Sequence, residues 1–402
     1  MNNRLYENEK VGLFQESADD QNSFTHEEIN EKYKKGEVRI ITEQARYPLN
    51  TIVNLVSSED YILNPEFQRR HRWDVSRKSK LIESFIMNVP IPPIFLYEVE
   101  YSIYEVMDGL QRLTAISQFY EDEFELQDLV EWKELNGLTY SKLPEQIRKG
   151  IDRRYISSII LLQETAKTVS EANRLKQLVF ERINSGGEKL EAQEIRNALY
   201  PGILNNLTIS LSRNIFFCKL WNIPEPDQAE IDTGKPRKEV MEDKYFKDMT
   251  DAELVLRFFA YRQMDQWQGN TMKFFLDEFQ KKGNQQFDSE VTSKLEKLFN
   301  DTINFAYELF GEKAFCLYRK REDKWFHYDR PAKILYDPLM QALSNKLSRK
   351  QELLTKREEI IDGLEQFHKS QFELFKGRDT NKTKVLERIY VLDDYLSSFI
   401  ND

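Results

Sequence analysis

The residues best suited to chemistry lie in the segment YSIYEVMDGLQRLTAISQFYEDEF, from Tyr101 to Phe124. Its alternation predicts a strand ending at Met107, and the apolar spacing of Leu110 to Tyr120 predicts a helix. Asp108 therefore lies at a strand-to-helix junction. A helix N-terminus presents unpaired N–H groups and a partial positive charge, and a glycine lets a phosphate approach the backbone closely. We expect a phosphate-binding site at this junction.

Three polar side chains of the junction suit phosphoryl transfer. Arg112 can donate two N–H groups to phosphate oxygens, and Gln111 can position an attacking water or a ribose. Asp108 can hold Mg²⁺ or orient water, which makes it the candidate metal ligand. Gly109 and Thr114 complete the expected nucleotide-binding residues of this segment. The structural alternative is that Asp108 is only the N-cap of a buried helix, because Asp-Gly turns are common.

A basic cluster lies upstream in NPEFQRRHRWDVSRKSK, from Asn64 to Lys80. Its second half predicts a helix capped by Asp74 or Ser76, which puts cations in the first turn, where they oppose the helix dipole. This arrangement favours an anionic partner. The candidates for nucleotide are Gln68, Arg69 and Arg72, and those for nucleic acid are Arg70 and Lys78. The alternative is a solvated charge run with Trp73 as a core aromatic.

A third candidate is the segment FERINSGGEKL, from Phe180 to Leu190. Here a helix is predicted to end near Ile183 and a second one to run to about Tyr200 after a glycine-containing turn. Arg182, Asn184 and Ser185 could contact a base, ribose or phosphate. The same letters also make an ordinary helix C-cap followed by a reverse turn.

Three phrases, PEFQRRHRWD, YEVMDGLQRLTAI and FERINSGGEKL, occur in this order and together resemble the N-terminal domain of GmrSD-type restriction enzymes. That family is related to the ParB and sulfiredoxin nucleotide-binding fold. In it an Asp-Gly-Gln-Gln-Arg motif is taken to bind and hydrolyse nucleoside triphosphates, and Asp108, Gly109, Gln111 and Arg112 match. Leu110 replaces the first Gln, so the resemblance leaves open whether hydrolysis survives here.

The resemblance and the apolar patterns together predict an α+β fold. We expect a small mixed α/β ParB/sulfiredoxin-like domain over residues 46–165, followed by a mostly α-helical domain over residues 166–402. Within the helical part, the charged and proline-containing stretch near residues 224–251 is predicted to be a long loop. Residues 1–45 are predicted to be a flexible acidic extension.

Composition limits the classes of function. The chain has 402 residues, 58 Lys+Arg and 68 Asp+Glu, and its net charge of -10 argues against a basic nucleic-acid-coating surface. Two cysteines cannot build a disulfide framework, and no stretch is long and apolar enough for a membrane helix, so we expect a cytoplasmic protein without membrane partners. Larger family members carry a nuclease domain of the His-Asn-His type, but the four scattered histidines suggest a stand-alone member without one.

A further mixed segment, LYRKREDKWFHYDR, runs from Leu317 to Arg330. It interleaves basic side chains with aromatic ones, as surfaces that stack nucleic-acid bases do. Arg319 and Arg321 are therefore further nucleic-acid candidates. Alternatively, the aromatics fill the core of the helical domain.

These observations lead to a hypothesis with one rival. The protein is expected to bind, and to hydrolyse with Mg²⁺, a nucleoside triphosphate, as part of a bacterial anti-phage system of the restriction type. Its expected partners are the nucleotide, DNA, and a nuclease or another defence protein. The rival is a non-catalytic module that senses nucleotide or DNA and regulates a separate nuclease.

Overall fold

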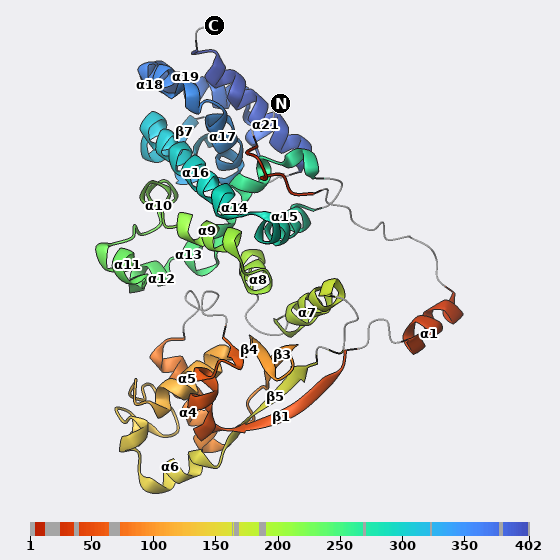
Figure 1. Ribbon diagram of the computed structural model, residues 1–402. Helices are drawn as coiled ribbons and strands as arrows, with labels where there is room; N and C mark the ends of the chain where they lie inside the picture. Colours follow the sequence, from red (N-terminus) through yellow and green to blue (C-terminus); the bar gives the residue numbers. More distant parts are fainter. Residues whose placement is uncertain are drawn as a thin grey trace. The chain divides into compact units, whose positions relative to one another are not determined.

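The computed structural model describes residues 5–12, 25–35, 40–63, 73–162, 164, 169–184, 190–267, 271–321, 324–377 and 381–400. The chain divides into two compact units. Asp20–Leu190 form one, which we call the sheet unit, and Met1–Asp19 with Glu191–Asp402 form the other, the helical unit. Figure 1 shows the elements of both units along the chain. The fold is α+β, as predicted.

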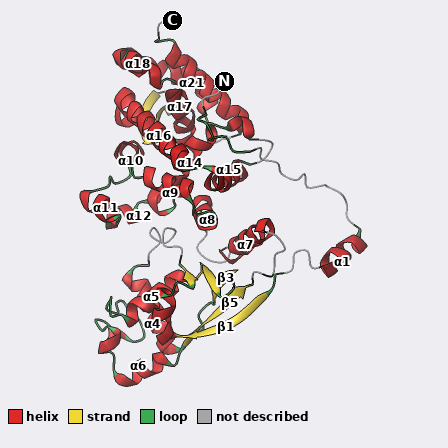
Figure 2. Ribbon diagram, in the orientation of Figure 1, coloured by secondary structure: helices red, strands yellow, loops and turns green. Residues whose placement is uncertain are grey.

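A five-stranded mixed sheet forms the centre of the sheet unit, in the order β1-β5-β3-β4-β2. Figure 2 shows the strands in yellow and labels β1, β5 and β3. The strands are β1 (Thr42–Pro48), β2 (Tyr61–Ile62), β3 (Ile94–Glu100), β4 (Ile103–Asp108) and β5 (Tyr155–Leu161). The β1/β5 and β3/β4 pairs are antiparallel, whereas β3/β5 and β2/β4 are parallel. Leu96 and Val106 are paired across β3 and β4 and both are buried, which marks the core face of the sheet.

Helices cover that core face. The helices of this unit are α1 (His26–Lys35), α2 (Ile52–Ser57), α4 (Val75–Met87), α5 (Leu110–Tyr120), α6 (Glu145–Asp152) and α7 (Val169–Asn184), with 3-10 turns η1 (Leu49–Thr51), η2 (Lys133–Leu135) and η3 (Tyr140–Lys142). Ile82 and Phe85 of α4 and Leu113 and Ile116 of α5 join one hydrophobic core with Leu96 of β3. Helix α7 instead contacts the opposite face of the sheet at β4, as the site geometry below shows.

The helical unit is built around long amphipathic helices. Its helices are α8 (Ala192–Leu199), α9 (Ile203–Leu211), α10 (Ile215–Trp221), α11 (Gln228–Thr233), α12 (Lys238–Glu242), α13 (Lys244–Lys247), α14 (Thr250–Tyr261), α15 (Met272–Gln286), α16 (Ser289–Phe310), α17 (Lys333–Asn345), α18 (Lys350–Thr355), α19 (Arg357–Ser370), α20 (Phe372–Phe375) and α21 (Lys382–Ser397). The 3-10 turns η5 (Met264–Gln266), η6 (Gly311–Lys313) and η7 (Leu347–Arg349) connect some of them. Helix α16 shows why they form, because Asp288 caps its first turn and Leu295, Phe299 and Ile303 recur along one buried face.

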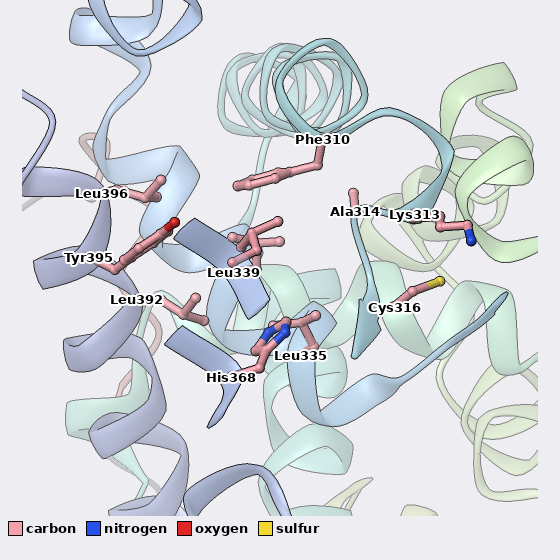
Figure 3. Close-up of a pocket in the computed structure, with 11 residues that line it drawn as sticks. Phe310, Lys313, Ala314, Cys316, Leu335, Leu339, His368, Leu392, Tyr395 and Leu396 are labelled. Atoms are coloured by element: carbon pink, nitrogen blue, oxygen red, sulfur yellow. The ribbon is translucent and has the colours of Figure 1, made fainter. Parts of the chain in front are cut away.

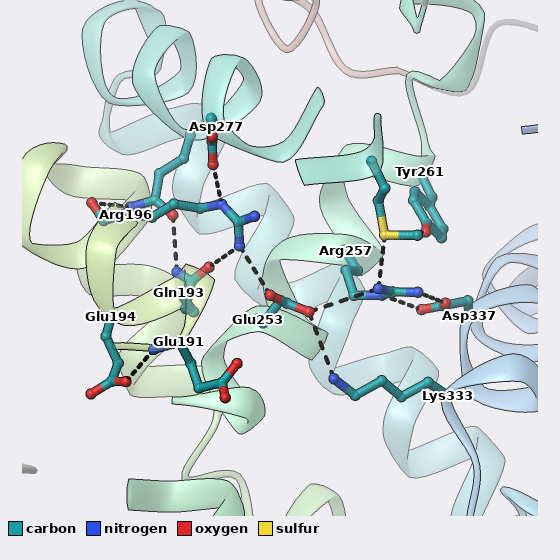
Figure 4. Close-up of polar contacts among 12 residues, drawn as sticks. Glu191, Gln193, Glu194, Arg196, Glu253, Arg257, Tyr261, Asp277, Lys333 and Asp337 are labelled. Atoms are coloured by element: carbon teal, nitrogen blue, oxygen red, sulfur yellow. Dashed lines mark hydrogen bonds and ion pairs between the residues drawn. The ribbon is translucent and has the colours of Figure 1, made fainter. Parts of the chain in front are cut away.

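A buried charge network fixes the first helices of this unit (Figure 4). Arg196 of α8 donates to Asp277 of α15 at 2.6 Å and to Glu253 of α14 at 3.0 Å. Arg257 of α14 pairs with Asp337 of α17. Burial raises the pKa of the Glu253 carboxyl, but the neighbouring cations outweigh burial and hold that pKa below its usual value. Because a buried charge needs its partner, the network specifies how α8, α14, α15 and α17 pack.

Four expectations differ from the structure. The first 45 residues are not all a loose extension: Val11 is fully buried, Glu9 pairs with Arg262 at 2.6 Å, and β1 begins at Thr42. The partner of this N-terminal segment lies some 250 residues away, which no local pattern reveals. The compact units divide after Leu190, not after residue 165, because α7 packs on β4.

The other two differences lie in the helical unit. The stretch near residues 224–251 is not one long loop but contains three short helices, α11, α12 and α13, two of them capped by aspartates. The unit also contains a β-hairpin, β6 (Cys316–Arg321) and β7 (Lys324–Pro331), in addition to the mostly helical structure that was expected. Among the described residues, no helix is long and apolar enough to cross a membrane.

Candidate functional site

The junction between β4 and α5 has the geometry predicted from the sequence. Asp108 is the last residue of β4, Gly109 is the N-cap residue, and α5 begins at Leu110. Gly109 has φ of 95°, which is a left-handed conformation that costs residues with a Cβ atom. A Cβ atom at this position would also lie 2.4 Å from Cγ2 of Ile94. Both the backbone and the neighbouring strand therefore require glycine here.

Asp108 and Arg112 form an ion pair across this turn. The Arg112 Nη2 atom lies 2.5 Å from Asp108 Oδ2, and Nη1 donates to the carbonyl of Pro92 at 2.5 Å. The Arg112 side chain is 11% exposed and the Asp108 side chain 34%. Burial lowers the pKa of the guanidinium, and Asp108 opposes this shift. The guanidinium is thus held in a fixed, largely desolvated position beside the start of α5.

The Asp108 carboxylate pairs with Arg112 and does not cap the helix. Gly109 has no side chain, and α5 has no side-chain cap hydrogen bond at its N-terminus. The alternative that Asp108 serves only as an N-cap is therefore wrong. The N-terminal amides of α5 add a partial positive charge beside the Asp108–Arg112 pair, whose own charges offset each other.

Gln111 has a contact that the sequence did not suggest. Its Oε1 atom accepts the backbone N–H of Trp73 at 3.1 Å. Trp73 in turn lies under the Arg77 guanidinium, 4.8 Å from the ring centroid. Gln111, the second residue of α5, therefore fixes the backbone of Trp73, the residue that follows the Asn64 to Arg72 segment.

The basic cluster is only partly within the described residues. Gln68, Arg69, Arg70 and Arg72 lie outside them. In the described part, Asp74 accepts the N–H of Arg77 at 2.7 Å and caps α4, as predicted. Lys78 is half-buried, and its Nζ donates to Gln118 of α5 at 2.8 Å while lying 5.5 Å from the Phe124 ring centroid. Lys78 thus links α4 to α5.

The other nucleotide candidates lie on two helices. Thr114 is half-buried in α5, one turn after the junction, and Arg182 is exposed near the end of α7. Helix α7 ends at Asn184, close to the predicted end. The side chain of Asn184 and all of Ser185 lie outside the described residues.

Sequence reasoning missed an ion pair on the other face of the sheet. Lys176 of α7 pairs with Glu105 of β4, and each side chain is 12% exposed. Glu105 is paired with Tyr97 of β3, opposite in direction to the buried Leu96 and Val106. The sequence signal for this ion pair was Glu105 itself, a charged residue between Tyr104 and Val106 in the middle of the strand.

Leu110, where the chain departs from the Asp-Gly-Gln-Gln-Arg motif, points into the core. Its side chain is 5% exposed and belongs to the same hydrophobic cluster as Leu113 and Ile116. The departure therefore lies on the buried side of α5, whereas Asp108 and Arg112 form the more exposed side of the junction.

A second feature that the sequence did not indicate is a small cavity in the helical unit (Figure 3). His368 faces apolar side chains there, among them Leu335 and Leu392, and it is 3% exposed. Its Nδ1 atom accepts the N–H of Tyr318 at 3.3 Å, and its Nε2 atom has no partner in the described structure. Burial lowers the pKa of His368 to about 4. Its ring is therefore neutral at pH 7.

No group of three or more His, Cys, Asp or Glu side chains that could hold a metal occurs among the described residues. Arg319, predicted as a nucleic-acid contact, is half-buried on β6. Arg321 ends the same strand, and its side chain lies outside the described residues. These two positions belong to the hairpin of the helical unit and not to the sheet unit that carries Asp108.

Comparison with known proteins gives one match. Searches of the curated proteins and of the solved structures give no significant match. Residues 49–201 match the family model for the GmrSD restriction endonuclease, N-terminal domain. The match extends past the sheet unit and includes α8, which packs within the helical unit through Arg196. The region that contains Asp108, Gly109 and Arg112 therefore resembles the N-terminal domain of GmrSD-type restriction endonucleases, as the three sequence phrases predicted.

Proposed function

We propose that the β4–α5 junction binds and hydrolyses a nucleoside triphosphate, within a restriction-type defence system. The observation that carries this proposal is the Asp108–Arg112 pair, which spans Gly109 at an N-terminus for which the described residues supply no side-chain cap. A positively polarised helix end, a glycine and a fixed guanidinium together suit a phosphate group. The restriction endonuclease domain supports the defence role.

The ion pair suggests how the site changes when phosphate binds. Arg112 keeps its contact with the Pro92 carbonyl through Nη1, and Nη2 turns from Asp108 to a phosphate oxygen. The Asp108 carboxylate is then released to orient the attacking water. Because Arg112 is already desolvated, its charge acts strongly on the phosphate without further loss of water.

Mg²⁺ fits this site in the form it usually takes with nucleotides. It would be held by one carboxylate, Asp108, with phosphate oxygens and waters as its other ligands. When bound, it would neutralise charge on the phosphates. The residues Gln68, Arg69, Arg72, Thr114, Arg182, Asn184 and Ser185 remain proposed nucleotide contacts.

The position of Leu110 supports turnover at this site. Since Leu110 is buried in the core of the sheet unit, its replacement of Gln removes no polar group from the side of α5 that holds Asp108 and Arg112. The residues that would touch phosphate and water all remain.

Phosphate release from ATP, GTP, CTP and UTP with Mg²⁺ tests the proposal. We expect turnover of at least one nucleotide by the wild-type protein, and a loss of about 100-fold or more in Asp108→Asn and in Arg112→Lys. The matched control is the exposed pair Glu145 and Lys149 on α6, which has the same spacing of four residues. Glu145→Gln and Lys149→Met should leave turnover unchanged. No release by the wild type, or equal release by Asp108→Asn, would reject the proposal.

A further inference from the structure

We propose that the outward face of the β6–β7 hairpin binds single-stranded DNA. This face carries two exposed aromatic rings, Phe326 and Tyr328, among the basic side chains of Arg319, Lys324 and Arg330. It lies in the helical unit, so the proposal is independent of the chemistry at Asp108. We call this set of five residues the hairpin face.

Strand alternation separates the two faces of the hairpin. Lys324, Phe326 and Tyr328 of β7 are exposed, whereas Trp325 and His327 between them are half-buried. The alternation ends there, because the pairing with β6 is irregular and residues 328, 329 and 330 are all exposed. Arg319 of β6 is directly opposite Phe326, so the two side chains lie on the same face. Arg319, Lys324 and Phe326 therefore share one surface because of the period of two along a strand. Tyr328 and Arg330 are exposed in the irregular segment that follows.

The opposite face fixes the hairpin to the rest of the helical unit. Trp325 packs edge-on against Phe372 of α20, with ring centroids 5.4 Å apart. His327 stacks on Tyr318 at 4.3 Å, and the Tyr318 N–H donates to His368 of α19. The aromatic side chains of this inner face therefore pack within the helical unit. The expectation that the aromatics fill the core is wrong for Phe326, which is 48% exposed, and for Tyr328, which is 40% exposed, whereas Trp325 is half-buried against Phe372.

The charges of the hairpin face favour an anionic partner. In the described part of the chain, Arg319, Lys324 and Arg330 have no carboxylate within ion-pair distance. Asp329 is the acidic residue among the described positions of β7, and it pairs with Lys313 at 2.5 Å. A local group of cations that form no ion pair with a described residue can still attract phosphates on a chain of net charge -10, because charges beyond about 8 Å are largely screened at physiological salt.

The exposed aromatic rings favour a single-stranded nucleic acid over other anionic partners. An aromatic face stacks on an unpaired base, but a base within a duplex has both faces covered by its neighbours. Phe326 and Tyr328 lie two positions apart, which is about 7 Å along a strand, so each ring has room for its own nucleotide. Basic side chains beside them can follow the phosphates. The similarity of residues 49–201 to the N-terminal domain of the GmrSD restriction endonuclease makes DNA the expected nucleic acid.

Binding of labelled oligonucleotides by the full-length protein tests this inference. Fluorescence anisotropy would compare a 20-nucleotide oligo(dT), the matching oligo(rU) and a 20-base-pair duplex at 50 mM salt. We expect oligo(dT) to bind most tightly, and Phe326→Ala with Tyr328→Ala to weaken its binding by about tenfold or more. Lys324→Glu with Arg330→Glu should weaken it too, and should flatten the log-log salt slope by about 1.4, because each single-strand phosphate contact contributes about 0.7.

Two control variants keep the result specific. Tyr390 on α21 is 70% exposed and Lys238 on α12 is highly exposed, and both lie in the helical unit away from the hairpin in sequence. Tyr390→Ala and Lys238→Glu should bind oligo(dT) like the wild type, and thermal melts should show that all variants are folded. The inference fails if the wild type does not bind oligo(dT), if the double alanine variant binds equally well, or if duplex or oligo(rU) is preferred. Phosphate release should be the same in the hairpin variants, whatever the outcome for Asp108.

Discussion

Lys176 of α7 and Glu105 of β4 form a buried ion pair three residues before Asp108 on the same strand. The Lys176 ammonium also lies 5.7 Å from the ring centroid of Tyr97, and burial together with Glu105 raises the pKa of that tyrosine. Helix α7 is therefore held on the face of the sheet opposite α5. The same strand connects this contact to the candidate phosphate site.

Breaking this pair from one side should loosen β4. Lys176→Met leaves Glu105 buried without its cation, and we expect a loss of about 3 to 5 kcal/mol in local stability. The double variant with Glu105→Leu should recover much of it, because apolar groups of similar size can replace a buried pair. Hydrogen exchange of peptides covering β3, β4 and α7 would measure the change within this unit.

The exposed pair Glu145 and Lys149 again serves as the control. Lys149→Met should change exchange in α6 by less than about 1 kcal/mol, because solvent screens exposed ion pairs. If Lys176→Met has an equally small effect, the buried pair does not hold α7 on β4.

A comparison of alanine substitutions at Gly109 and at Gly137 separates the cost of backbone strain from the cost of crowding against Ile94. Gly109→Ala meets both an unfavourable φ of 95° and the Ile94 side chain, whereas Gly137→Ala meets only an unfavourable φ of 82° with no atom within 4 Å. We expect about 1 to 2 kcal/mol of destabilisation for Gly137→Ala, and at least about 1 kcal/mol more for Gly109→Ala. Hydrogen exchange in α5 and in residues 126–138, measured at increasing denaturant concentration, would give both losses of stability. Equal losses would mean that Ile94 moves aside freely.

Local patterns predicted the strand–turn–helix junction at Asp108 better than they predicted the architecture around it. The strand, the glycine turn and the helix at Asp108 follow from alternation, from Gly109 and from helical spacing, which all act over a few residues. The pairing of Asp108 with Arg112 also lies within one helical turn. The contact from Gln111 to Trp73 spans 38 residues, and nothing in either segment indicates the other.

The helical unit shows the same limit. Helical spacing correctly predicted most of it, but the β6–β7 hairpin has charges and aromatics in a pattern that fits both a helix and a strand. Its register is set by Tyr318 and His327, which stack across the two strands, and by His368 of α19. The Glu9–Arg262 pair likewise depends on packing between distant segments. Such tertiary contacts override local preference.

Leu110→Gln restores the family motif. It tests whether a side chain at position 110 lies only in the core or also reaches the nucleotide. Because Leu110 is 5% exposed among apolar neighbours, an amide there loses its hydrogen bonds to water. We expect a loss of about 1 to 3 kcal/mol in stability and no gain in phosphate release. A clear increase in turnover would show instead that a Gln at this position reaches the nucleotide.

His368 should make the helical unit less stable in acid. Its pKa is about 4 in the folded chain, where it is buried, and 6.5 without burial. Below pH 6.5 the unfolded chain binds a proton that the folded chain does not, so the free energy of unfolding falls as the pH falls from about 6.5 to about 4. The contribution is present in full above pH 6.5, and its complete loss is worth up to about 3 kcal/mol.

The variant His368→Leu separates this effect from the titration of carboxylates. Leucine fills the cavity near Leu335 and Leu392 without a titratable group, so its stability should depend less on pH between 4 and 6.5. The control is His26→Leu, at an exposed position on α1, which should keep the wild-type pH dependence. Urea denaturation at several pH values, monitored by exchange in α19, would compare the three proteins. If His368→Leu retains the full pH dependence, the acid sensitivity of this unit arises from other groups, and the unpartnered Nε2 atom of His368 accepts a proton without cost.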